Sequence, residues 1–193
     1  MSFDPDDPIG SVFAPVIGRP AWRVIDGYGS FLTLEFGAPH LAVREPIISG
    51  SSSARVRQTL ARRRVTPQGD WSLWIYCCAW QAFDGDRLVG TSDGKRAELH
   101  RVAQCLDGQI LTGVAVDFAR AHTYFTFDLG GRLETQSMGD DDEQWSISTP
   151  ESFHLSLRSD GACSWHANVT PPAEQIWQSN NGTGQAGLVT RPD

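Results

Sequence analysis

The sequence has no hydrophobic run long enough to cross a membrane. A membrane-spanning helix needs about 18 or more consecutive apolar residues, and no such run occurs in this chain of 193 residues. The first eight residues also lack the positively charged and apolar segments of a secretory signal. The four cysteines, Cys77, Cys78, Cys105 and Cys163, show no spacing typical of a disulfide framework. We therefore expect a cytoplasmic protein in a reducing compartment.

Positive charge is scarce as well. The chain carries 16 lysine and arginine residues against 23 aspartate and glutamate residues, which gives a net charge of -7 with histidine neutral. This negative balance opposes non-specific binding to phosphate backbones and to anionic lipids. We therefore expect neither nucleic acid nor a membrane as a partner, and a basic protein partner fits better.

The length suits one domain with a sizeable core and is too short for two ordinary domains. After Ala167 the apolar density falls, and proline, glutamine, asparagine, glycine and threonine predominate. We expect an N-terminal arm over residues 1–16, a single domain over 17–166, and a C-terminal tail over 167–193 that is extended or mobile.

Five Asp-Gly dipeptides separate segments in which apolar and polar residues alternate, which is typical of strands joined by tight turns. One helix is predicted over 94–106, because apolar residues recur at helical spacing from Leu99 to Leu106 and Asp93 is a candidate N-cap. A weaker helix candidate runs over 54–63. The expected fold class is α+β: a strongly bent, mainly antiparallel sheet or partly open barrel with one principal helix packed on it. A second, sandwich-like sheet is the alternative.

The segment from Trp71 to Phe83 is largely apolar at both its odd and its even positions. A strand with this pattern is expected to be covered on both faces. We therefore predict one long strand over about 70–83, with its three tryptophans as the nucleus of the core.

Several segments together resemble a family of small, uncharacterised bacterial proteins, a domain of unknown function. They are Arg63-Arg-Val65, Gly69-Asp-Trp-Ser-Leu-Trp-Ile-Tyr-Cys77, Trp80, Leu106-Asp-Gly-Gln-Ile-Leu111 and Phe127-Asp-Leu-Gly-Gly-Arg-Leu-Glu-Thr135. The resemblance covers roughly residues 17–160. It implies a compact cytoplasmic domain and no particular catalytic residue.

The most suggestive catalytic set is Glu35, Asp128 and His122. The segments 31–37 and 124–130 match class for class, so their carboxylates could converge at one end of a sheet. A ligand on the concave face of that sheet would also meet Thr33, Tyr124 and Thr126. The alternative is that each acid before a glycine turn is solvated or bonds the amides of the turn.

Two charge clusters are candidates for partner binding. The basic cluster comprises Arg55, Arg57, Arg62, Arg63 and Arg64, and it could bind phosphate or an acidic partner. The favoured alternative is a solvated loop that pairs with the acidic run, and such surface pairs contribute only about 0 to 1 kcal/mol each. The acidic run itself comprises Asp140, Asp141, Asp142 and Glu143.

The sequence offers little support for a cofactor or a metal. The segment Gly182-Thr-Gly-Gln-Ala-Gly187 matches a dinucleotide-binding fingerprint by letter, but only six residues follow it and no helix fits there. Cys163 and His166 are three positions apart, with His154 on a neighbouring predicted strand, and this spacing is not diagnostic of a metal site. We therefore expect no cofactor and no metal.

These observations favour a non-catalytic binding or interaction protein, and an acidic neutraliser of a basic partner is one concrete version. The motivation is the negative surface together with the lack of an assembled catalytic motif, including any GxSxG nucleophile elbow. The alternative is a small-molecule-binding protein or hydrolase-like enzyme that uses the concave face of the sheet.

Overall fold

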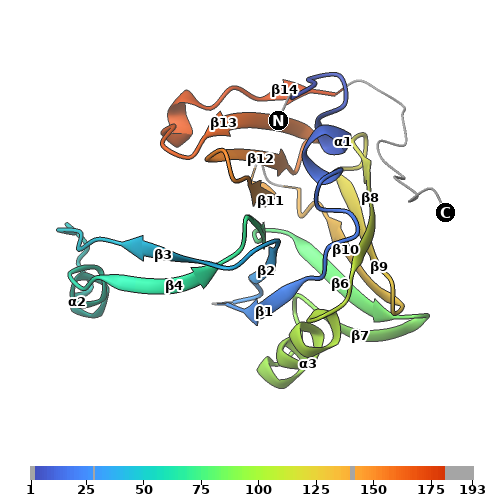
Figure 1. Cartoon of the computed structure of the whole chain (residues 1–193), viewed down its shortest axis with the longest axis horizontal. Helices are drawn as coiled ribbons and strands as arrows, with labels where there is room; N and C mark the ends of the chain where they lie inside the picture. Colours follow the sequence, from blue (N-terminus) through green and yellow to red (C-terminus); the bar gives the residue numbers. More distant parts are fainter. Residues whose placement is uncertain (1–2, 28, 140–141, 181–193) are drawn as a thin grey trace.

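Two antiparallel sheets packed face to face form most of the computed structural model, which describes residues 3–27, 29–139 and 142–180 (Figure 1). The seven-stranded sheet has the order β1-β2-β5-β11-β12-β13-β14, and the five-stranded sheet has the order β7-β6-β10-β9-β8. The first sheet contains β1 (Trp22–Asp26), β2 (Leu32–Phe36), β5 (Trp71–Ile75), β11 (Glu143–Ser148), β12 (Phe153–Arg158), β13 (Ala162–Ala167) and β14 (Gln178–Ser179). The second contains β6 (Ala79–Asp84), β7 (Arg87–Thr91), β8 (Leu111–Asp117), β9 (His122–Phe127) and β10 (Gly131–Gln136).

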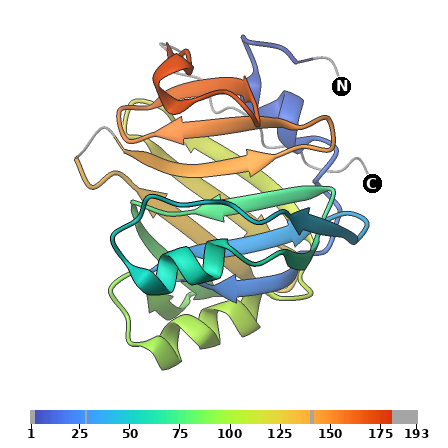
Figure 2. The same cartoon turned by 90° about the vertical axis from the view of Figure 1, so that its left-hand side faces the viewer.

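A third element lies outside both sheets. Strands β3 (His40–Arg44) and β4 (Arg64–Gln68) pair only with each other among the described strands, and α2 (Ala54–Leu60) lies between them in the chain. We call residues 40–68 the projecting hairpin. It extends away from the seven-stranded sheet in Figure 1 and lies in front of the outer face of that sheet in Figure 2.

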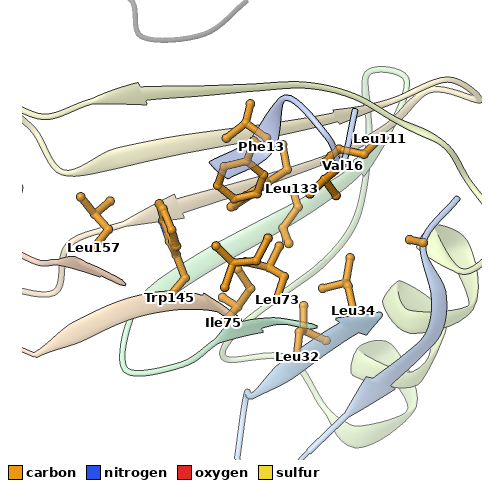
Figure 3. Packing of buried hydrophobic residues seen from close by; sticks show 14 of the residues in the cluster. Phe13, Val16, Leu32, Leu34, Leu73, Ile75, Leu111, Leu133, Trp145 and Leu157 are labelled. Atoms are coloured by element: carbon orange, nitrogen blue, oxygen red, sulfur yellow. The ribbon is translucent and has the colours of Figure 1, made fainter. Parts of the chain in front are cut away.

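The hydrophobic core fills the space between the two sheets (Figure 3). Leu73 and Trp145 reach into it from the seven-stranded sheet, Phe125 and Leu133 reach into it from the five-stranded sheet, and all four are fully buried. The indole N–H of Trp145 donates to Thr123 Oγ1 of the opposite sheet at 2.9 Å. The sheets are therefore joined by apolar contact and by a buried hydrogen bond, which removes the cost of leaving the indole unpaired.

The N-terminal segment belongs to this core. Helix α1 (Pro8–Phe13) is capped by Asp7, whose side chain accepts from the Gly10 N–H, and it buries Ile9, Val12 and Phe13. The Phe13 ring lies 5.8 Å from that of Trp145, measured between ring centroids. Residues 8–13 thus contribute to the packed domain, which corrects the expectation of a separate N-terminal arm over 1–16.

The predicted helix is present as α3 (Arg96–Leu106), the longest of the described helices. It buries Leu99, Val102, Ala103 and Leu106, the apolar positions that the sequence indicated. Lys95 occupies the N-cap position in place of Asp93 and makes no side-chain capping bond. Helix α3 packs against β1 and β7, which are edge strands of the two sheets, so it covers one open side of the sandwich.

The segment 71–83 is not one strand, which corrects the prediction. Strand β5 lies in the seven-stranded sheet and β6 in the five-stranded sheet, with a corner at Tyr76–Cys78 where Cys77 has φ +49°. Before the corner the odd positions point inward, and after it Trp80 and other even positions do. Each of these two strands buries only one face, but β5 buries its odd positions and β6 its even positions. Read as one segment, they give the apolar pattern of a single strand that is buried on both faces.

Two sheets therefore replace the single bent sheet or partly open barrel, and the architecture is that of the sandwich-like alternative. The mainly antiparallel pairing and the presence of helices agree with the α+β expectation. None of the described helices combines the length and the apolar character needed to cross a membrane.

Part of the predicted C-terminal tail is packed onto the domain. The short helix η1 (Pro172–Glu174) leads into β14, which pairs with β13. The guanidinium of Arg158 lies over the Trp177 ring at 5.0 Å from its centroid, a cation–π arrangement. Residues 181–193, including the glycine-rich segment 182–187, lie outside the described residues.

Substitutions at two adjacent residues of β5 test whether only one face of this strand is buried. We predict that Leu73→Ala lowers the free energy of unfolding by about 2–5 kcal/mol, because it leaves a cavity between the sheets. Trp74→Ala should cost well under half as much, since Trp74 is 52% exposed on the outer face. Urea unfolding of both variants measures the difference. Equal losses would contradict the placement of Trp74 outside the core.

Candidate binding surface

The structure does not bring together the catalytic set indicated by the sequence. Glu35 lies in β2 of the seven-stranded sheet, whereas His122 begins β9 and Asp128 follows it in the five-stranded sheet. The ligand-contact candidates are divided in the same way, with Thr33 in β2 and both Tyr124 and Thr126 in β9. The interior between the sheets, where the concave site was expected, is filled by the hydrophobic core.

Glu35 has a structural environment at the root of the projecting hairpin. Its side chain is buried, and Oε2 accepts from the Gly69 N–H at 3.0 Å while Oε1 lies 3.4 Å from Nη1 of Arg23. Arg23 has φ +50° at a register shift in β1, and Glu35 lies opposite the neighbouring Trp22 in the ladder. Burial raises the pKa of the Glu35 carboxyl group, and the Gly69 hydrogen bond and the Arg23 charge oppose this rise only in part.

A second carboxylate anchors the same root. Asp70 Oδ2 accepts from the Ala38 N–H at 2.7 Å, so it joins the two chain segments that enter and leave the hairpin. Gly69 has no room for a side chain, because a Cβ there would lie 2.4 Å from the Phe36 carbonyl oxygen. Polar bonds and close backbone packing therefore hold the hairpin to the sheet at its base.

The outer face of the five-stranded sheet carries a cluster around His122. Its ring stacks on Tyr124 at 4.3 Å between centroids, and its Nε2 lies 3.8 Å from Oε2 of Glu134. Glu134 also pairs with Arg132 at 2.7 Å. Asp128 is not part of this cluster, because its Oδ1 accepts from the Ile110 N–H at 2.8 Å and so holds the end of β9 to the start of β8. Of the predicted residues, only His122 and Tyr124 are in contact.

The outer face of the seven-stranded sheet carries a row of serine and histidine side chains; the sequence pointed to His154 and His166 on neighbouring strands but not to their serine partners. Ser146 Oγ lies 3.0 Å from Nδ1 of His154, and Ser164 Oγ lies 3.2 Å from Nδ1 of His166. The two imidazole rings stack at 5.7 Å. Burial lowers the pKa of both histidines. Neutral imidazoles on this face can exchange hydrogen bonds with a polar ligand, but no carboxylate is positioned to complete a triad among the described contacts.

The basic cluster lies at the far end of the projecting hairpin. Arg44 donates to the carbonyl oxygens of Thr59 (3.1 Å), Leu60 (3.3 Å) and Arg62 (3.2 Å). These groups lie at the C-terminus of α2, where a positive charge is stabilised by the helix dipole. Arg63 forms a bidentate pair with Glu45, with its Nη2 2.8 Å from Oε2. Arg44 and Arg63 thus bond within the hairpin, and the expected pairing with the acidic run stays a prediction because Asp140 and Asp141 lie outside the described residues.

Three guanidinium groups of the basic cluster, those of Arg55, Arg62 and Arg64, have no hydrogen-bond or ion-pair partner in the described part of the chain. Two of them, on Arg62 and Arg64, border a cavity. Together with Arg44 and Arg63 they line a shallow cavity of about 270 Å³, completed by Gln58 and Thr59. This cavity offers two free guanidinium groups to an anion.

The projecting hairpin also exposes apolar side chains. Leu41 and Val43 of β3 are 70% and 53% exposed. Residues 40–68 contain six arginines and one glutamate, a net charge of +5, so the remaining residues carry -12 to give the total of -7. A basic, partly apolar extension therefore stands on an acidic body.

The acidic run is described only in part. Asp140 and Asp141 lie outside the described residues. Glu143 begins β11, and its carboxylate accepts a hydrogen bond from the Tyr76 hydroxyl group. Burial raises the pKa of Tyr76, and Glu143 raises it further. The Asp142 carbonyl oxygen accepts from the Ser159 N–H at 3.0 Å. Glu143 is thus already engaged within the chain.

Comparison of the chain with family models, with curated proteins and with solved structures finds no significant match. The resemblance to an uncharacterised bacterial family stays a prediction. Within the described residues no group of three or more histidine, cysteine, aspartate or glutamate side chains is arranged to hold a metal ion.

The buried carboxylate at the root of the hairpin predicts a pH dependence. The folded state raises the pKa of Glu35 from its ordinary value of 4.5, so the native protein holds this proton more tightly than the unfolded chain. The contribution of Glu35 to stability is therefore fully present below its unfolded pKa and is lost as pH rises through its raised folded pKa, whereas Gln at this position does not titrate. We expect the free energy of unfolding of Glu35→Gln to rise relative to the wild type across the pH range between these two pKa values, as measured by urea unfolding.

Asp160→Asn provides a control of opposite sign. Hydrogen bonding to Arg158 lowers the pKa of Asp160, so the stability it contributes is present above its unfolded pKa and is lost on acidification. Asp160→Asn should therefore lose stability relative to the wild type as pH rises through the acid range up to the unfolded pKa of 3.8. A Glu35→Gln difference that does not change with pH would contradict the assignment of a protonation cost to Glu35.

Proposed function

We propose that this protein is a non-catalytic binding protein that captures an acidic partner with its projecting hairpin. The observation that carries the proposal is the concentration of positive charge and exposed apolar side chains on one extension of an otherwise acidic chain. The guanidinium groups of Arg62 and Arg64 have no partner in the described structure, and Leu41 and Val43 are largely exposed. A surface of this composition is typical of a recognition site, since it gives both electrostatic complementarity and apolar contact.

The geometry favours an acidic partner at the hairpin over the basic partner expected from the net charge. Within the acidic run, Glu143 is already engaged, because its carboxylate accepts a hydrogen bond from the Tyr76 hydroxyl group. The body contributes in another way: its negative charge repels an acidic partner everywhere except at the hairpin. Charge of both signs on one chain therefore orients the encounter as well as attracting the partner.

The two candidate catalytic carboxylates are already bonded within the chain, which supports a non-catalytic role. Glu35 is occupied by the Gly69 N–H and by Arg23, and Asp128 is occupied by the Ile110 N–H. A general base has to reach a proton of the substrate. Both carboxylates instead hold backbone segments that are distant in the sequence, so they bond neither a substrate proton nor the amides of the adjacent glycine turns.

Retention on immobilised polyglutamate tests the proposal. Despite its net charge of -7, the wild type should bind this matrix through the projecting hairpin, and Arg62→Ala/Arg64→Ala should elute at a clearly lower salt concentration. Removing two of the positive charges reduces the number of released counterions and so the salt dependence.

The double variant Arg101→Ala/Arg120→Ala is the matched control, because it removes the same charge from exposed positions of the body. It should elute with the wild type. Equal shifts for the two double variants would show that net charge, not the hairpin, sets binding. Retention of the wild type on polylysine and not on polyglutamate would favour the basic partner instead.

A further inference from the structure

The β3–β4 ladder determines which backbone groups of the projecting hairpin are free. The residue pairs are His40–Gln68, Leu41–Pro67, Ala42–Thr66, Val43–Val65 and Arg44–Arg64. Proline has no N–H, so a continuous ladder requires the Leu41–Pro67 pair to be a pair without mutual hydrogen bonds. Because the two kinds of pair alternate along an antiparallel ladder, Val43–Val65 is then also a pair without mutual hydrogen bonds.

The outward edge of β3 is therefore defined by Leu41 and Val43, whose N–H and C=O groups point away from β4. Their N–H groups donate to no backbone acceptor among the described turn and loop contacts, and β3 has no second neighbour among the described strands. On the other side of the hairpin, Pro67 blunts the edge of β4, because a proline cannot donate to an added strand. Of the two edges of the projecting hairpin, only the edge formed by β3 has no proline.

The two faces of the hairpin differ in chemistry. Side chains alternate between faces along a strand, so Leu41 and Val43 share the face of Val65 and Pro67, while Arg44 and Arg64 share the opposite face. A strand added beside β3 would present its own side chains alternately to an apolar face and to a basic face. The best complement is thus an extended segment that alternates apolar and acidic residues.

We infer that an extended acidic segment of the partner adds to the edge of β3 as a further antiparallel or parallel strand. This inference rests on the proposed capture of an acidic partner and specifies how capture occurs. Main-chain hydrogen bonds to Leu41 and Val43 give affinity, as in other complexes formed by strand addition. Apolar residues of the segment cover these two side chains, and its acidic residues face Arg44 and Arg64. Beyond Val43 the segment reaches the arginine-lined cavity.

Two synthetic peptides of equal length and charge test this inference. One alternates glutamate with valine, and the other alternates glutamate with proline, so only the first can donate main-chain hydrogen bonds to β3 while its apolar side chains share the face of Leu41 and Val43. Fluorescence polarisation of labelled peptides should show that the wild type binds the valine peptide at least about tenfold more tightly, a difference worth about 1.4 kcal/mol.

Two valine-to-proline variants of the protein provide the matched test on its side. Val43→Pro removes an outward N–H of β3 and should abolish the advantage of the valine peptide. Val65→Pro makes the same change at the cross-strand neighbour, on the edge that Pro67 already blunts, and should leave the advantage intact. Amide exchange at Ala42 and Thr66 verifies that the ladder persists in each variant, and Leu41→Pro repeats the test at the other outward N–H.

The outcomes separate this inference from the proposed function. Equal binding of the two peptides to the wild type, or equal losses in Val43→Pro and Val65→Pro, overturns strand addition. If the peptides bind equally and Arg62→Ala/Arg64→Ala weakens both, charge-based capture stands without strand addition. If the arginine variant changes neither affinity, the proposed function fails as well.

Discussion

Leu73, Trp145 and Phe125 meet in the dry space between two sheets, and the chain supplies both sheets only because its apolar phase reverses at Tyr76–Cys78. Burial of these large side chains provides the dominant favourable free energy of the fold. The reversal also determines which side chains lie on the outer faces of the two sheets. Trp74, Thr33 of β2 and Tyr124 of β9 have no place in the core, so they face away from it on two separate surfaces.

The projecting hairpin stands apart from that interface. The hydrophobic core includes Phe36 and Trp71 and no residue between them. The hairpin is held at its root by Glu35 and Asp70, which bond backbone N–H groups. Its far end is organised by Arg44, whose guanidinium group caps α2. Stability and recognition are therefore carried by different parts of the chain, and the hairpin can expose apolar and basic side chains without weakening the core.

Residue periodicity predicts α3 and a mainly antiparallel strand content, because one-sided burial imposes a period on each element. It does not predict how strands are divided between sheets. The reversed phase within 71–83 looks the same as burial on both faces, so the pattern predicts one sheet where there are two. The matching segments around Glu35 and Asp128 suggest one end of one sheet, but they lie in different sheets. The contacts of Ser146 and His154 depend on the register of β11 and β12, which no local pattern specifies. The charge asymmetry of Arg62 and Arg64 is visible in the sequence, but their lack of partners is not.

Differential scanning calorimetry of a chain without the hairpin is the most direct test that the core is independent of it. His40 and Gln68 are paired at the base of the hairpin, so residues 41–67 can be replaced by an Asn-Gly turn with little change in the path of the chain. The account predicts a single cooperative transition within a few degrees of the wild-type Tm. Loss of the cooperative transition, or a large fall in Tm, would show that the hairpin is part of the core and would contradict the division of roles.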